Sequence, residues 1–143
     1  MKRIESEIKQ IAYPQENVYN KLSDLSNLRA IADRIPMEQN DKFQIRDLEC
    51  SADQVSCSIS PVGRIALGII QREPFKCIKM ETLQSPVRMT MWIQLVPTGP
   101  MSCKMKLTVD ADINIFMAKM VEKPLVQAVG KLADMLSMIP YND

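Results

Sequence analysis

The sequence predicts an α+β fold in which an antiparallel sheet is covered by one long helix close to the C-terminal end. Apolar residues keep helical spacing through residues 113–139, whereas between residues 42 and 112 they alternate with polar ones. Short segments rich in turn residues separate the alternating stretches, which favours an antiparallel meander over parallel strands that need long crossovers. A chain of 143 residues can bury roughly two thirds of its unfolded surface, so we expect a single domain over 1–143.

The first elements are a strand and two short helices. Residues 3–12 alternate as a strand would, with Ile4 and Ile8 on one face. Pro14 favours the start of a short helix. A second short helix follows and ends at Pro36, because proline removes the amide that the helix needs.

Six further strands are expected from the period of two. They cover residues 42–50, 54–60, 64–73, 75–83, 87–96 and 101–112. The last two have apolar faces made by Val87, Met89, Met91, Ile93 and Leu95, and by Met101, Cys103, Met105, Leu107 and Val109. Their opposite faces carry polar residues and Trp92, so one side of this seven-stranded sheet is expected to be dry and the other wet.

The long helix is expected to bury one side. That side consists of Val121, Leu125, Ala128, Val129, Leu132, Leu136 and Ile139. Pro124 cannot donate its amide to the preceding turn, so we expect either a kink or a short first segment with the main helix starting near Pro124. Such a helix needs a broad apolar partner, which the predicted sheet supplies.

This order of elements resembles the START-like helix-grip superfamily, also called SRPBCC, which includes birch-pollen-allergen-like proteins and polyketide cyclases. The opening IESEIKQIAYPQENVYNKLSDLSNLRAI is similar to the first strand and proline-linked helix of that family, with Val18 and the segment Leu22-Ser23-Asp24 matching its pattern. Leu125 to Leu136 resemble its gripping helix. The resemblance implies a curved sheet wrapped around the long helix and an elongated cavity between them, commonly for lipids, sterols or polyketides. It brings no invariant catalytic motif, so it implies little about the reaction, if any.

Methionine is the residue type that points to the same cavity independently. The chain has 11 methionines, and thioether side chains adapt to varied apolar partners. They are equally able to fill a solid core, and that alternative stays open. We expect a small hydrophobic ligand to contact apolar residues of the central strands and the long helix. The predicted set is Ile78, Met80, Met89, Met91, Ile93, Met105, Leu107, Met117, Met120, Leu125, Val129 and Leu132.

Several kinds of chemistry are excluded or unsupported. The chain has no histidine, which excludes Ser-His and Cys-His catalysis. Its four cysteines stand singly in predicted strands, which favours buried reduced thiols over a zinc site. We therefore expect no metal and no cofactor. No catalytic residue is assigned.

Polar residues near the predicted cavity leave two alternatives to a carrier. The candidates for acid–base chemistry are carboxylates accompanied by arginines. They are Asp47, Glu81, Asp110 and Glu122, with Arg46, Arg64 and Arg88. Cyclases and dehydratases of the superfamily place such groups in the cavity, but solvated cross-strand pairs explain them as well. An exposed Trp92 beside Arg88 would suit a protein-interaction surface, or be a single harmless surface aromatic.

Charge and hydropathy limit the partners further. The net charge is +1, and no run of like charges exceeds two residues, so nucleic acid is not an expected partner. No window is long and apolar enough for a membrane span, and the amino terminus lacks the apolar core of a signal peptide. We expect a cytoplasmic protein that carries or senses a small apolar molecule, with a cyclase-type enzyme second and an interaction module third. The sequence does not indicate the oligomeric state.

Overall fold

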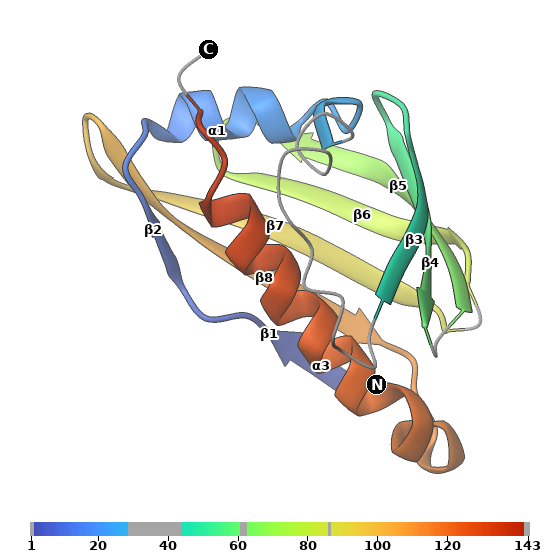
Figure 1. Cartoon of the computed structure of the whole chain (residues 1–143). Coiled ribbons are helices and arrows are strands. Elements are labelled where there is room, and N and C mark those ends of the chain that lie inside the picture. The colour runs from blue at the N-terminus through green and yellow to red at the C-terminus, as the bar shows by residue number, and fades with distance from the viewer. Residues whose placement is uncertain (1, 29–43, 61–62, 86, 142–143) are drawn as a thin grey trace.

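The protein has a sheet layer with one long helix lying across it and a short helix at one end (Figure 1). This computed structural model describes residues 2–28, 44–60, 63–85 and 87–141. The strands run in the order β1-β8-β7-β6-β5-β4-β3, and β2 extends the edge next to β1 by pairing with β8. All of these pairs are antiparallel. The predicted α+β helix-grip class is confirmed.

The strand boundaries follow the alternating pattern closely. The strands are β1 (Lys2–Glu5), β2 (Lys9–Ile11), β3 (Gln44–Cys50), β4 (Gln54–Ser60), β5 (Gly63–Glu73), β6 (Cys77–Gln84), β7 (Met89–Gly99) and β8 (Ser102–Ala111). The helices with described bounds are α1 (Gln15–Leu22) and α3 (Ile115–Ser137). The seven predicted strands are present, and the first is divided into β1 and β2.

The division of the first strand corrects its predicted faces. Glu5 lies opposite Thr108 and Lys9 opposite Met105, so this strand has one residue more than its partner between the two pairs. Ser6 fills the break, since its amide donates to the Leu107 carbonyl at 2.8 Å and its Oγ accepts from the Leu107 amide at 2.9 Å. An extra residue of this kind is a β-bulge, which reverses the side-chain alternation.

Because of the bulge, Ile8 and Ile11 lie on opposite faces from those that the alternation predicts. Ile8, expected to share the buried face with Ile4, is 62% exposed, and Ile11 is buried instead. The prediction for Ile8 is therefore wrong. The alternation within residues 3–12 could not reveal the bulge, because the bulge is defined by the partner strand.

Helix α1 closes one end of the sheet. It follows Pro14 as predicted, buries Val18, Tyr19 and Leu22, and packs on β7 and β8. The turn between β5 and β6 reaches the same helix, where the ring of Phe75 meets Tyr19 edge-on at 5.6 Å between centroids. Of the predicted second helix, the helical residues 27 and 28 are described, and the remainder to Pro36 lies outside the described residues.

Helix α3 runs as one element through Pro124. Of the two alternatives expected at Pro124, a main helix that starts there is wrong, because nine helical residues precede the proline, and the kink stays a prediction. Its buried side is the predicted one, with Val121, Leu125, Val129 and Leu136 all buried. Among the described residues, no helix is both long and apolar enough to cross a bilayer.

The segment after α3 is fixed against the rest of the fold by Tyr141. Its side chain is fully buried, and its hydroxyl donates to the Leu136 carbonyl at 2.7 Å. Its own carbonyl accepts from the Asn17 side-chain amide at 2.9 Å. These bonds link α1 to the end of α3, so both helices are held at the same end of the sheet.

Candidate ligand-binding site

The inner face of the central strands is a continuous apolar surface. In the register of the sheet, Ile78 of β6 lies opposite Ile93 of β7, which lies opposite Leu107 of β8. The neighbouring row joins Met80, Met91 and Val109 in the same way. Residues of these rows point to one side because every second side chain of a strand shares a face. The predicted dry face of β7 and β8 is thereby confirmed except at Met101, which is 67% exposed because it lies in the turn before β8.

Nine of the twelve predicted site residues are buried between sheet and helix. They are Ile78, Met80, Met89, Met91, Ile93, Met105, Leu107, Leu125 and Val129, each with 0–6% of its surface exposed. Leu132 is partly buried and packs against them. The side chain of Met117 lies outside the described residues. Met120 is 71% exposed, which corrects the expectation that it faces the sheet. Whether the set binds a ligand stays a prediction.

The part of this face beneath α3 is densely packed. Met105 and Leu107 expose none of their surface and Met80 exposes 1%. A side chain touched by a water-sized void would keep accessible surface, so these residues fill a core of ordinary density. Helix α3 is in repeated contact with β8, β1 and β2. We call the inner face of β6, β7 and β8 the closed half of the sheet.

The inner face continues onto β4 and β5, where Ile65 is buried but three other apolar residues are packed more loosely. Ile69 lies opposite Met80, and Leu67 lies opposite Val55, so the apolar rows extend across two more strands. Val55, Leu67 and Ile69 pack against the core but are only partly buried. We call these three residues the open half. They were not among the predicted site residues, although the alternation of Ile65, Leu67 and Ile69 in the sequence placed them on one face.

The carboxylates considered for catalysis lie on the outer surface wherever their side chains are described. Asp110 receives two hydrogen bonds from the Arg3 guanidinium, at 2.7 and 3.0 Å. Those hydrogen bonds hold the pKa of Asp110 below its usual value. Glu122 pairs with Lys2 at 2.9 Å. Both carboxylates therefore form ion pairs at the surface, which is the alternative to a catalytic role given above.

The remaining candidates have the same character or are not described. Glu81 and Arg88 are exposed. The guanidinium of Arg64 bonds Ser56 at 3.0 Å and the Glu49 carboxylate at 3.3 Å. The side chains of Arg46 and Asp47 lie outside the described residues. None of the described candidates therefore points into the apolar interior.

Trp92 lies on the outer face with different neighbours from those expected. It is half-buried, and the cationic groups of Lys79 and Arg3 stand 5.6 and 5.9 Å from its ring centroid. Thr108, the residue opposite it on β8, is buried and donates its hydroxyl to the Gln94 side chain at 2.8 Å. The outer face is thus polar but partly covered, so Trp92 and Arg88 do not form the predicted exposed pair.

Among the described residues, the ionisable groups of the interior are thiols and the phenols of Tyr19 and Tyr141. The four cysteines are free, and burial raises the pKa of the Cys57 and Cys103 thiols. Burial also raises the pKa of Tyr141. All three shifts favour the neutral form. Within the described ranges, no group of three carboxylate or thiol side chains gathers as metal ligands would.

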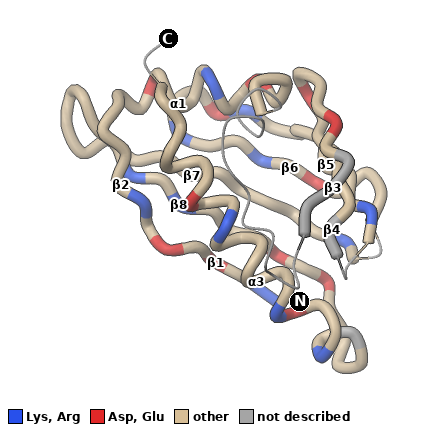
Figure 2. Tube along the Cα trace, viewed as in Figure 1, with Lys and Arg blue, Asp and Glu red and all other residues tan. Residues whose placement is uncertain are grey.

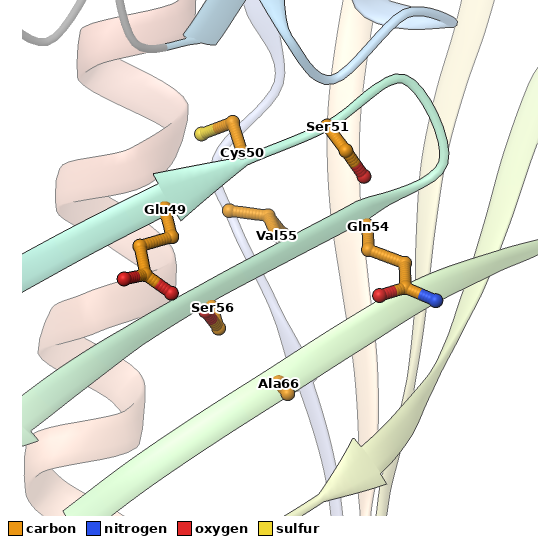
Figure 3. Close-up of a pocket in the computed structure, with 7 residues that line it drawn as sticks. All are labelled: Glu49, Cys50, Ser51, Gln54, Val55, Ser56 and Ala66. Carbon is orange, nitrogen blue, oxygen red and sulfur yellow. The ribbon is translucent and has the colours of Figure 1, made fainter.

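A hollow of about 270 Å³ lies beside the hairpin of β3 and β4 (Figure 3). Its lining comes from β3, β4 and β5 and consists of Glu49, Cys50, Ser51, Gln54, Val55, Ser56 and Ala66. Most of these side chains are polar, and Arg64 already bonds two of them. The hollow therefore suits an apolar ligand less well than the open half of the inner face does.

Solved structures share this fold at low sequence identity. Norcoclaurine synthase from Thalictrum flavum, solved in complex with dopamine and hydroxybenzaldehyde, aligns with a TM-score of 0.68 and 18% identity over 95% of this chain and 84% of its own. A START superfamily protein from Mycobacterium smegmatis aligns with a TM-score of 0.66 and 15% identity over 94% of each chain. No protein-family model and no curated protein matches the sequence. The likeness shows the helix-grip fold, and a shared fold does not by itself assign a function.

Proposed function

We propose that the protein binds a small hydrophobic molecule, such as a lipid or a polyketide, on the inner face of the sheet beside α3. The observation that carries the proposal is the contrast along one apolar face, where Val55, Leu67 and Ile69 are only partly buried although the adjacent rows are sealed. An apolar surface left short of partners gains free energy when an apolar ligand covers it. The ligand would cover the open half and lie beside Met80 of β6, the residue opposite Ile69.

The proposal favours binding over catalysis. A general acid or base must lie within hydrogen-bond reach of the reacting atoms. The described carboxylates pair with basic residues or face solvent. The buried phenol of Tyr141 already donates its proton to a backbone carbonyl. Among the side chains that the structure describes, the interior therefore offers no free carboxylate for a cyclase-type reaction. The free cysteines fit a reducing compartment, so we also propose the cytoplasm as the site of action.

Binding of an apolar fluorescent probe tests the proposal. The probe is 1-anilinonaphthalene-8-sulfonate, whose emission rises when it leaves water. Ile69→Trp should fill the open half and reduce probe binding at least severalfold, because the larger side chain occupies the apolar space. The matched control is Ile70→Trp, since Ile70 is the next residue and is 49% exposed. The control should bind the probe as the unchanged protein does.

Native mass spectrometry of freshly purified protein measures the mass of any molecule that stays bound during purification. A bound apolar molecule that is lost from Ile69→Trp and kept by Ile70→Trp would support the proposal. A protein that binds no probe and carries no molecule, or one in which both variants bind equally, would contradict it.

A further inference from the structure

The first turns of α3 expose large apolar side chains to solvent. Phe116 is 87% exposed, Ile115 83% and Met120 71%. They have the highest exposures among the large hydrophobic residues described in the structure. In Figure 1 these turns extend past the edge of the sheet beyond β1. Isolated exposed apolar residues are ordinary, but a group of this size at one end of a helix marks an interaction surface.

Lysines lie among these apolar residues. Phe116, Lys119, Met120 and Lys123 follow the spacing i, i+3, i+4 and i+7, which places them on one face of the helix. All four are exposed. The buried residue Val121 occupies the opposite face. The projecting face therefore combines apolar and basic side chains. We use the name α3 tip for the group of Ile115, Phe116, Lys119, Met120 and Lys123.

The α3 tip carries two lysines, against one exposed carboxylate, Asp112, three residues before the helix. No ion pair is formed by Lys119 or Lys123 with the residues that the structure describes. The acidic residue of the same turns, Glu122, is occupied by Lys2 at 2.9 Å. Figure 2 shows basic segments on the turns that project from the sheet. Charge complementarity therefore favours an anionic partner.

Exposed apolar residues together with lysines favour a membrane surface over a protein as the partner. Centres of protein interfaces are depleted in lysine. Helices that lie in a membrane interface combine aromatic and aliphatic residues with lysines, whose long side chains reach the lipid headgroups while the apolar residues enter the acyl boundary. Anionic headgroups attract such lysines electrostatically. We propose that the α3 tip docks on the surface of a bilayer that contains anionic lipids, with Phe116, Ile115 and Met120 inserted.

Co-sedimentation with vesicles tests the docking. The unchanged protein should bind vesicles of phosphatidylcholine with phosphatidylserine and bind vesicles of phosphatidylcholine alone much less. Added salt should weaken the binding, because it screens exposed charges. Each lysine near an anionic surface contributes about a fivefold gain in binding. The double variant Lys119→Glu/Lys123→Glu should therefore bind at least tenfold more weakly, and Phe116→Ser should also bind more weakly.

Matched controls come from the hairpin between β7 and β8, which lies at the opposite end of the molecule in Figure 1. Met101 there is 67% exposed and Lys104 is exposed. Met101→Ser and Lys104→Glu should leave vesicle binding unchanged. All four variants replace exposed side chains, so their melting temperatures should stay close to that of the unchanged protein.

Three results would overturn the docking. The unchanged protein could fail to bind anionic vesicles, or the tip and hairpin variants could bind equally. Light scattering could instead show a dimer that Phe116→Ser dissociates with no change in vesicle binding, which would make the tip a contact between copies. Probe binding by Ile69→Trp and Ile70→Trp is measured separately without vesicles, so the ligand proposal and the docking can fail independently.

Discussion

The two halves of the sheet's inner face have similar residues and different packing. In the closed half, Leu107 exposes none of its surface on β8, the strand that α3 contacts most. In the open half, Leu67 is only partly buried, on a strand whose pairing with β6 shifts register between Ala66 and Leu67 and again between Ile69 and Gln71. Both leucines come from strands with an alternating pattern, but within the described residues α3 is in repeated contact with β8 and not with β5. A helix about 10 Å wide covers two or three strands spaced by roughly 5 Å, and a sheet this broad extends beyond it.

Truncation of the two leucines should give the largest difference between the halves. Leu107→Ala should lower the free energy of unfolding by about 2–5 kcal/mol, because it leaves a cavity in packed surroundings. Leu67→Ala should cost about half as much or less, since its side chain already has incomplete contacts. Urea unfolding of both variants measures the difference. Equal losses would show that the open half is packed as tightly as the closed half.

Enlargement of a valine in each half should give a smaller difference of the opposite kind. Val129 of α3 is buried against the closed half, so Val129→Phe should destabilise the protein by about 1–3 kcal/mol through overpacking. Val55 is partly buried in the open half, so Val55→Phe should change the melting temperature little and should weaken binding of the fluorescent probe. A strong loss of stability in Val55→Phe with unchanged probe binding would contradict the assignment of the open half.

The contrast between the halves explains what the sequence could predict. The strands from β3 to β8 and the buried side of α3 follow from local periodicity, because each residue's face is set by its own backbone geometry. The sequence could therefore predict which residues of β6, β7 and β8 form the apolar face. The likeness to a helix-grip fold supplied the placement of α3 across it.

The errors come from properties that need a partner segment. Ile8 turns outward because Ser6 pairs twice with Leu107, and nothing in residues 3–12 encodes that pairing. Met120 satisfies the apolar composition of α3 but lies on its exposed side, since these first turns project beyond the sheet. Thr108 alternates as a solvent-facing residue and is nevertheless buried, where its hydroxyl bonds Gln94. The position of the open half likewise depends on how far α3 reaches.

Alkaline pH should weaken the packed end of the molecule through Tyr141. Burial raises the pKa of its phenol above the unfolded value of about 10, so the unfolded chain loses this proton first. Stability from the protonated phenol is therefore complete below pH 10 and falls as the pH rises above it, by up to about 1.4 kcal/mol per pH unit. Urea unfolding at several pH values should show this additional slope in the unchanged protein and its absence in Tyr141→Phe. Identical slopes would mean that the phenol is exposed to solvent in the folded protein.

The outer face should give the smallest effect, in contrast to both halves of the inner face. The side chain of Arg3 is 61% exposed, and ion pairs in such positions contribute little net stability because water and salt screen them. Asp110→Asn keeps the shape and an oxygen that can accept from Arg3, so at neutral pH it should cost less than Leu67→Ala. Arg3 lowers the pKa of Asp110, so what stability the carboxylate adds is present above the unfolded pKa of about 4 and is lost as the pH falls through the folded value. Melting temperatures of the two proteins should therefore differ slightly at pH 7 and converge in acid. A loss at pH 7 as large as that of Leu107→Ala would show that the outer face, with Trp92 half-buried beside Arg3, contributes to stability as a second core.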